Sequence, residues 1–396
     1  MDPRSNPYNP GAGLRPFALT GRDDDIEAVE VLADRATRGL MSRSMVFSGL
    51  RGVGKTVLLN ELAGRTQQRN WFTVQIEADR SHPERFARSL AVEFINGARS
   101  QRRWFSKRNE QVRDALRTIT SFQISLGLDG FRFDIDLDRS SARANTGDLY
   151  IDLADLATSV GVAASESGIG VALFIDEMQD LTAEQMSAVC RSCHLAAQRH
   201  LPWFVIGGGL PNLPKALAEA ESYAERLFEY RTIDRLGDEA ARSALVLPTA
   251  AADVVWANDA CEFALSESGG YPYFIQQFGK STWDAAIGPS TISLDDATFG
   301  IAEGQQQLDH GFYASRWERA TPTERRFLEA MAPDDGASSA SSDVAGRLGK
   351  SLSSLGPARA SLINKGIVYS PEHGSIAFTV PGMADFVRRR ARAERP

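Results

Sequence analysis

The sequence of 396 residues predicts an α/β fold: a parallel sheet with helices on both faces, followed by a helical region and a small C-terminal domain. Three observations support this prediction. A glycine-rich loop joins a short apolar strand to a helix near the N-terminus, and apolar strand segments alternate with helical segments up to about residue 233. The remaining pattern is helical until a final hairpin signal. Strands that alternate with helices are expected to pair in parallel, because a parallel pair needs a long crossover connection.

The composition is that of an ordinary globular protein, with 43% hydrophobic and 24% charged residues. A chain of this length is expected to form two or three domains. No apolar run reaches the roughly 18–20 residues of a membrane span, and the polar N-terminus does not resemble a signal peptide. We therefore expect a cytoplasmic protein without membrane contact. The net charge of −7 argues against non-specific nucleic-acid binding by the whole surface.

The glycine-rich loop runs Gly49-Leu50-Arg51-Gly52-Val53-Gly54-Lys55-Thr56 and fits the pattern G-x-x-x-x-G-K-[ST] of P-loop nucleotidases. The apolar segment 44–48 precedes it, and a helical pattern through Val57 follows it, which is the strand-loop-helix context that this chemistry needs. Backbone N–H groups of such a loop bind phosphate. Lys55 can reach the β- and γ-phosphates, and the Thr56 hydroxyl can bind Mg²⁺. The sequence therefore predicts ATP and Mg²⁺ as cofactors.

A second apolar strand segment, 171–175, ends in two carboxylates, Asp176 and Glu177. An acidic residue at the carboxyl end of a parallel strand beside a P-loop can hold Mg²⁺, which makes Asp176 a predicted metal ligand with Thr56. A second carboxylate next to it can orient or deprotonate the attacking water. We therefore predict Glu177 and Lys55 as catalytic residues.

The remaining patterns divide the chain into four predicted segments. Residues 1–18, rich in Pro, Gly and Asn, should form an extended arm that either packs against the purine ring or has a structural role only. Residues 19–233 should form the P-loop ATPase core, with residues 99–147 inserted as a helix and a β-hairpin. Residues 234–316 should form a helical lid, and residues 317–396 a winged helix domain.

The predicted insertion depends on two patterns. Residues 99–108 are basic with two aromatic side chains, and residues 122–136 alternate apolar and polar around Asp129-Gly130, which is a hairpin signal. This insertion could contact nucleic acid or a neighbouring subunit, or it could cover an edge of the core.

The predicted winged helix depends on the order helix, helix, helix, hairpin after the capped start at Thr321. The expected recognition helix, 352–364, carries only Arg359, with Lys350 and Lys365 at its ends. These are few positive charges for a phosphate-binding face. Duplex DNA and a protein partner therefore both stay open as predictions.

Taken together, these motifs resemble the AAA+ ATPases of the origin-recognition initiator type and the related STAND-like prokaryotic ATPases. Gly21-Arg22 resembles the entry motif beside the adenine in that family, and Pro272 in Gly270-Tyr271-Pro272 resembles the G-x-P motif of its lid. The segment 223–228 resembles the one that carries the arginine finger, and Arg226 is the candidate. The resemblance thus implies a homo-oligomer in which Arg226 acts on a neighbouring subunit.

Two positions depart from the family pattern. The strand that ends at Gly207 offers no Asn, Thr or Ser where AAA+ proteins usually place a polar sensor, and the Gly-Tyr-Pro helix starts without a sensor arginine. Both departures favour a slow nucleotide switch over a motor. We predict an ATP-binding switch with slow Mg²⁺-dependent hydrolysis coupled to movement of the lid and winged helix, acting on DNA or a protein. The alternative is an ATP-gated protein scaffold with little hydrolysis and no DNA contact.

Overall fold

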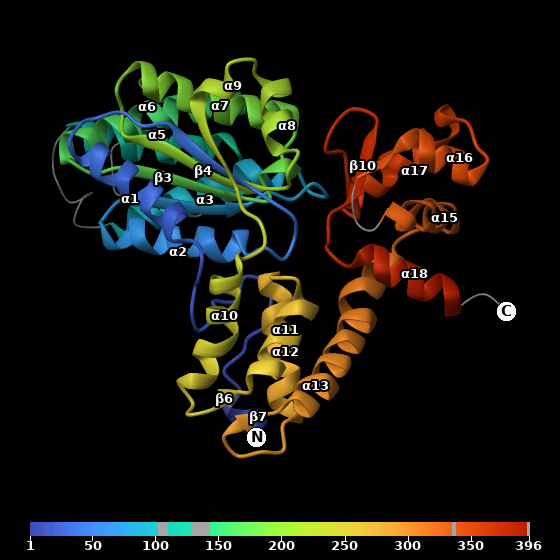
Figure 1. Cartoon of the computed structure of the whole chain (residues 1–396). Helices are drawn as coiled ribbons and strands as arrows, with labels where there is room; N and C mark the ends of the chain where they lie inside the picture. Colours follow the sequence, from blue (N-terminus) through green and yellow to red (C-terminus); the bar gives the residue numbers. More distant parts are fainter. Residues whose placement is uncertain (102–109, 129–142, 335–337, 394–396) are drawn as a thin grey trace.

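The computed structural model describes residues 1–101, 110–128, 143–334 and 338–393. Figure 1 shows three masses: a sheet with its helices, a group of helices below it, and a C-terminal part at the side. The N-terminus lies among the lower helices, and the C-terminus lies at the far edge of the C-terminal part. The predicted boundaries near residues 18, 233 and 316 remain predictions.

A five-stranded sheet forms the centre of the largest mass. Its strands lie in the order β2-β3-β4-β1-β5, and every neighbouring pair is parallel, as predicted. All side chains of β1, β3 and β4 are buried, because helices cover both faces of these central strands. The strands are β1 (Ser44–Ser48), β2 (Phe72–Glu77), β3 (Val171–Asp176), β4 (Trp203–Gly209) and β5 (Phe228–Thr232).

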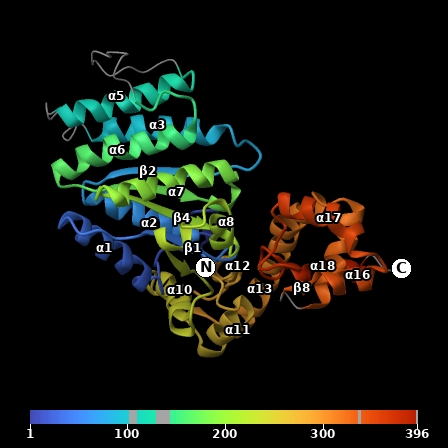
Figure 2. The same cartoon turned by 90° about the horizontal axis from the view of Figure 1, so that it is seen from above.

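Two hydrophobic clusters cover the two faces of this sheet. Phe47 and Phe174 pack with α1 and α2 on one face, whereas Val46 and Leu173 pack with α3, α5, α6 and α7 on the other. Figure 2 shows α3, α5 and α6 stacked on the side opposite α1. These helices are α1 (Asp23–Thr37), α2 (Lys55–Gln68), α3 (Arg85–Ser100), α5 (Glu110–Ser125), α6 (Leu149–Ser167) and α7 (Ala183–Gln198). Two short helices, α8 (Leu213–Ala220) and α9 (Ala224–Leu227), lead into β5.

The predicted hairpin in the insertion is wrong in its first arm. Residues 122–125 are the last turn of helix α5, whereas residues 129–142 lie outside the described part of the chain. This segment forms a helix and not a strand because four apolar side chains recur at helical spacing and are buried on one face. They are Val112, Ala115, Ile119 and Phe122. The alternation over residues 122–125 is therefore the end of a helical pattern.

Below the sheet, four longer helices form the helical group that was predicted as a lid. A two-stranded parallel pair, β6 (Val255–Trp256) and β7 (Thr291–Ile292), interrupts the purely helical pattern that we expected. The N-terminal arm enters this group, where Tyr8 is buried. The helices are α10 (Asp238–Ala250), α11 (Asn258–Ser268), α12 (Pro272–Ala285) and α13 (Leu294–Gln307), followed by a π-helical turn (Leu308–Tyr313) and α14 (Ala314–Glu318).

The C-terminal part contains three helices, an antiparallel three-stranded sheet in the order β8-β10-β9, and a final helix. The elements are α15 (Pro322–Met331), β8 (Ser339–Ala340), α16 (Ser341–Leu348), α17 (Leu352–Asn364), β9 (Val368–Tyr369), β10 (Ser375–Phe378) and α18 (Met383–Ala393). The predicted helices and hairpin are present, and β8 adds a strand. This part shares one hydrophobic cluster with the helical group, where Tyr313 stacks on Phe386.

Three short 3-10 helices complete the described secondary structure, at Pro3–Ser5, Met178–Asp180 and Ala332–Asp334. Within the described residues, no helix has the length and apolar character needed to cross a membrane.

Candidate nucleotide-binding site

A pocket of about 420 Å³ lies at the carboxyl end of the sheet. Most of its lining comes from the N-terminal arm, the glycine-rich loop with the start of α2, the start of α12, and the π-helical turn with α14. Glu177 and residues at the start of the helical group complete it. Parallel sheets commonly bind ligands outside the carboxyl ends of their strands, so the place of this pocket fits a ligand site.

The glycine-rich loop has the backbone shape that its sequence predicts. Gly52 and Gly54 adopt φ angles of 86° and 92°, in the left-handed region that side chains disfavour. A Cβ atom at Gly49 would lie 2.0 Å from the Ile233 carbonyl oxygen, so only glycine fits there. Gly54 caps α2 without a side-chain hydrogen bond, which leaves N–H groups of the first turn for a ligand. The loop is therefore built to hold an anion.

Lys55 is buried, with only 6% of its surface exposed. Its Nζ donates to the carbonyl oxygens of Gly49 and Leu50, at 3.0 and 2.8 Å. Burial lowers the pKa of the Lys55 ammonium, and the neighbouring carboxylates of Glu177 and Asp176 oppose that shift. A phosphate would give this amine the anionic partner that two carbonyl oxygens only partly replace.

Thr56 and Asp176, the two predicted metal ligands, are in direct contact. The Thr56 hydroxyl donates to Oδ2 of Asp176 at 2.6 Å, and the Glu177 backbone N–H donates to Oδ1 at 2.8 Å. Burial raises the pKa of the Asp176 carboxyl. A hydroxyl and a carboxylate are the hard oxygen ligands that Mg²⁺ prefers. Since Mg²⁺ in such sites also takes water and phosphate oxygens, it needs no protein cluster of three ligands, and the described residues form none.

Glu177 follows directly in a strained conformation, with φ at 48°. Its Oε2 accepts a hydrogen bond from Gln179 Nε2 at 2.6 Å and lies 3.8 Å from Nη2 of Arg51. The left-handed conformation turns the chain sharply after β3, and Glu177 lines the pocket beside Lys55 and Thr56. Such strain is common at functional sites.

The predicted entry motif lies beside this pocket, which Arg22 lines. The Arg22 guanidinium is almost buried and donates to the backbone oxygens of Val53 and Asp234, at 3.0 and 2.6 Å. It thereby ties the glycine-rich loop to the start of the helical group. Gly21 has a φ of 64° and packs closely against Ala240.

Pro272 lines the pocket at the first turn of α12. The next residue, Tyr273, donates its backbone N–H to the carbonyl oxygen of Gly52 at 3.3 Å. The predicted lid motif is therefore in contact with the glycine-rich loop.

Arg226 lies away from these residues. It is exposed on α9, directly before β5, and β5 starts beside the first residue of β1, since Phe228 pairs with Ser44. The pocket lies beyond the other end of β1, roughly 16 Å further along the strand. Arg226 therefore cannot reach the pocket of its own chain.

The sequence did not identify two arginines as positively charged groups of this pocket. Arg51 was named only as a loop residue, and Arg316 was not named at all. The Arg316 guanidinium lies 4.2 Å from the centre of the Phe312 ring, and its Nε is buried without a hydrogen-bond partner. Burial, with the nearby Arg51 charge, lowers its pKa to about 10. No motif marks Arg316, because its place depends on how α14 packs.

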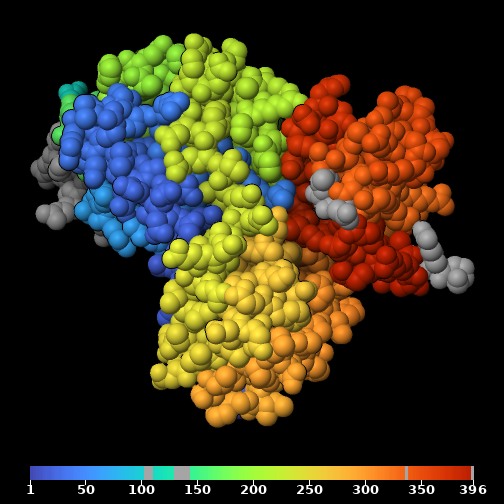
Figure 3. Space-filling view, in the orientation of Figure 1, coloured from blue at the N-terminus to red at the C-terminus, as the bar shows by residue number. Residues whose placement is uncertain are grey.

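The C-terminal part contacts the same loop. The Arg51 backbone N–H donates to the Thr379 carbonyl oxygen at 2.9 Å, and the Arg51 guanidinium lies over Gly366. Arg80 donates to the Ile363 carbonyl oxygen at 3.4 Å. Figure 3 shows the C-terminal part lying directly against the rest of the molecule. The pocket thus has this part as a close neighbour.

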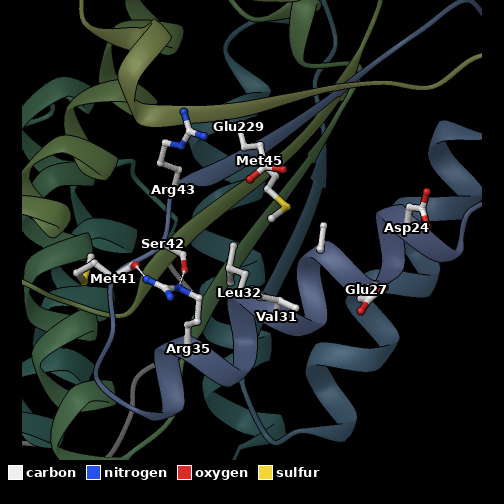
Figure 4. Close-up of a pocket in the computed structure, with 11 residues that line it drawn as sticks. Asp24, Glu27, Val31, Leu32, Arg35, Met41, Ser42, Arg43, Met45 and Glu229 are labelled. Carbon is white, nitrogen blue, oxygen red and sulfur yellow. Dashed lines mark hydrogen bonds between the residues drawn. The ribbon is translucent and has the colours of Figure 1, made fainter.

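A second hollow of about 570 Å³ lies between α1, the loop after it, and β5 (Figure 4). It is larger, but it is open and includes none of the glycine-rich loop or the two carboxylates. Arg35 donates to Ser42 across it. Only the first pocket therefore has the chemistry of a nucleotide site.

Comparison with known proteins supports an ATPase fold. The AAA ATPase domain family matches residues 18–206, and a domain of unknown function matches residues 310–387. Just under half of the chain is thus similar to AAA ATPase domains. The prediction of an AAA+ P-loop ATPase is confirmed for this segment. No curated protein matches the chain.

Solved structures with similar folds cover nearly the whole chain. A Walker-type ATPase of Pyrococcus abyssi has a TM-score of 0.55 at 14% identity, over 94% of this chain and 97% of that one. The ORC1 protein of Aeropyrum pernix in complex with DNA has a TM-score of 0.46 at 15% identity, over 96% and 95%. The RuvB Holliday junction branch migration motor of Thermotoga maritima has 0.44 at 14%, over 97% and 100%. The first of these supports the P-loop ATPase fold.

Proposed function

We propose that this AAA+ protein is an ATP-binding switch that hydrolyses ATP slowly with Mg²⁺. The observation that supports it best is that Lys55, Thr56 and Glu177 line one pocket, with Asp176 in direct contact with Thr56. The glycine-rich loop holds the phosphates, Lys55 neutralises their charge, and the arm and Pro272 enclose the rest of the nucleotide. Glu177 orients the attacking water and accepts its proton.

Mg²⁺ bound by Thr56 and Asp176 would supply charge neutralisation on the phosphate oxygens. The residues fit this ion because both offer oxygen atoms on the pocket side of α2 and β3, 2.6 Å apart. Their present hydrogen bond would be exchanged for bonds to the ion. The high burial of Asp176, which raises its pKa, favours a site where a cation compensates the carboxylate charge.

Nucleotide state is coupled to the rest of the molecule through the glycine-rich loop. The lid contacts Gly52 through Tyr273, and the C-terminal part contacts Arg51 through Thr379. The lid and C-terminal part also share a hydrophobic cluster, so they are expected to move together. A ligand that moves this loop therefore changes both contacts at once.

We assign a protein, rather than duplex DNA, as the favoured partner of the predicted winged helix. Two of the three positive charges near the expected recognition helix are held within the chain, whereas Lys350 is exposed. Arg359 donates to Ser370 and to the Ser375 carbonyl oxygen, and Lys365 pairs with Glu324 at 2.6 Å. Arg389 of the basic tail pairs with Asp309. Few charges are left for phosphates, which favours the scaffold alternative for the output.

Removal of the Lys55 charge should abolish most ATP binding. We expect Lys55→Ala to weaken the affinity for ATP by about 100-fold, because a buried charge-assisted contact to the phosphates is lost. Titration with a fluorescent ATP analogue measures this. Lys215→Ala is the matched control, since Lys215 is a half-exposed lysine whose ion-pair partner among the described residues is Glu219. An unchanged affinity in Lys55→Ala would overturn the assignment of this pocket.

Glu177→Gln should bind ATP but hydrolyse it on the order of 100-fold or more slowly, because a carboxamide cannot accept the proton of water. Phosphate release under saturating ATP, together with ATP affinity, separates the two effects. Glu184→Gln, at an exposed position in α7, is the control. A Glu177→Gln variant that turns over ATP at the wild-type rate would exclude Glu177 as the base.

A further inference from the structure

Gln179 is a buried polar residue next to the two carboxylates, with 5% of its surface exposed. It lies in the 3-10 turn Met178–Asp180, two residues after Glu177. A glutamine at such a place needs partners for its amide, because an unsatisfied polar group in the interior is costly. Both of its partners are part of the functional region.

The Gln179 amide bridges Glu177 and the end of β4. Its Nε2 donates to Oε2 of Glu177 at 2.6 Å, and its Oε1 accepts from the backbone N–H of Leu210 at 2.9 Å. The Leu210 N–H can only donate, so the amide oxygen must face it. The amide nitrogen must then face the carboxylate. The orientation of the amide is fixed by the network on both sides.

The glycines of β4 make this bridge possible. A Cβ atom at Gly209 would lie 2.5 Å from the Gln179 oxygen, and one at Gly207 would lie 2.5 Å from the Met178 sulfur. A larger residue at the end of β4 would therefore displace the turn. The sequence shows no polar side chain at the end of this strand, and the structure places the Gln179 amide there instead.

The contacts of the Glu177 carboxylate are asymmetric. Gln179 donates to Oε2, and the Arg51 guanidinium is nearest to the same oxygen, at 3.8 Å. Oε1 accepts no hydrogen bond from any residue that the structure describes. Two groups thus hold one oxygen and leave the other free for a water molecule.

We propose that Gln179 is a positioning residue for ATP hydrolysis: it fixes the Glu177 carboxylate to the end of β4, so that the free oxygen faces the attacking water. This inference rests on the proposed function, in which Glu177 is the base. Gln179 does not touch the nucleotide in this role, and it acts only through Glu177.

The first test is Gln179→Met in the full chain, which keeps the side-chain length and removes both hydrogen bonds. We expect kcat to fall by about 10- to 100-fold, the effect of a lost hydrogen bond to a charged group, with KM changed less than about threefold. Gln185→Met is the matched control, because Gln185 is a hydrogen-bonded glutamine on the neighbouring α7 that caps its helix and does not contact Glu177.

Gln179→Glu is the second variant and covers the case in which Gln179→Met does not fold. Assayed at alkaline pH, where both carboxyls are ionised, it keeps an acceptor for Leu210 N–H but does not donate to Glu177, and a second negative charge repels the carboxylate. The same loss of kcat is expected, with ATP affinity retained. A kcat within twofold of the wild-type value in a folded Gln179 variant would overturn the inference.

The double variant with Glu177→Gln separates a positioning role from a general structural one. If Gln179 acts through Glu177, adding Gln179→Met to Glu177→Gln should not reduce residual single-turnover hydrolysis further. An additional loss equal to that of the single variant would overturn the role. Absence of hydrolysis in the wild-type protein would overturn the proposed function itself, and this inference with it. Hydrolysis that depends on Glu177 but not on Gln179 would overturn this inference alone.

Discussion

At the scale of single residues, the pocket gathers cations from two distant parts of the sequence. Lys55 and Arg51 come from the glycine-rich loop, and Arg316 comes from the helix that joins the lid to the C-terminal part. Arg316 is held against Phe312, and burial lowers its pKa to about 10. It is still charged at neutral pH. A cation in a partly desolvated pocket next to another arginine is stabilised when an anion binds between them.

Arg316→Ala should therefore weaken ATP binding by about tenfold, the effect of losing one charge-assisted contact. The loss should be smaller for ADP if Arg316 faces the terminal phosphate. Titration with both nucleotides measures this difference. Arg319→Ala is the control, because Arg319 is an exposed arginine at the end of the same helix. Equal affinities of Arg316→Ala and the wild-type protein for ATP would exclude a phosphate contact.

At the scale of elements, one ion pair joins two helices of the C-terminal part. Glu324, in the first turn of α15, accepts a hydrogen bond from Lys365 after α17 at 2.6 Å and also completes the capping box of α15 with Thr321. Burial alone would raise the pKa of Glu324, but hydrogen bonds from Lys365 and Ser361 outweigh it and lower the pKa from 4.5 to about 2. The ionised form is thus favoured by folding.

The pH dependence follows from this depressed pKa. The contribution of Glu324 to stability is complete well above pH 4.5 and is lost as the pH falls from about 4.5 towards 2, because the unfolded state takes up a proton in this range before the folded state does. Glu324→Gln should reduce the free energy of unfolding by about 2 kcal/mol at pH 7, the range for a hydrogen bond to a charged group. Glutamine can still complete the capping box.

Urea unfolding followed by tryptophan fluorescence at pH 7 and at pH 3 measures both values. The difference between Glu324→Gln and the wild-type protein should shrink at the lower pH. Lys365→Met should behave in the same way, since it removes the other partner. A difference that is independent of pH would mean that packing, and not the ion pair, carries the effect.

At the scale of the whole molecule, the position of Arg226 bears on whether several copies of this chain assemble. It is exposed at the amino end of β5, at the opposite end of the sheet from its own pocket. If it is an arginine finger, as the family resemblance implies, it must act on the pocket of a neighbouring molecule. The alternative is a surface arginine without a role in hydrolysis.

Arg226→Ala should then bind ATP normally but hydrolyse it about 1000-fold more slowly, because the charge that it stabilises develops mainly in the transition state. Specific activity of the wild-type protein should rise with protein concentration. Mixing Arg226→Ala with Lys55→Ala should restore part of the activity, since each variant supplies the group that the other lacks. Activity independent of concentration, with no rescue on mixing, would identify a monomeric switch.

The sequence by itself determined those features whose residues are neighbours in the chain. The glycine-rich loop and the Asp176-Glu177 pair are short motifs, and the alternation of strands and helices predicted the parallel sheet that the structure has. Backbone conformation of a loop depends mainly on its own glycines, and the carboxyl ends of adjacent parallel strands lie at one edge. These properties are local, so the pattern was sufficient.

Only the tertiary structure decided which distant residues share a site. The Gln179 amide faces Glu177 because β4 ends in glycines, and Arg316 reaches the pocket because α14 packs beside the start of α12. The end of α5 was predicted as a strand because alternation over a few residues does not reveal that Phe122 packs against the core as part of a longer helix. Long-range packing selects among local alternatives that are close in free energy, and a single sequence does not show which contacts will form.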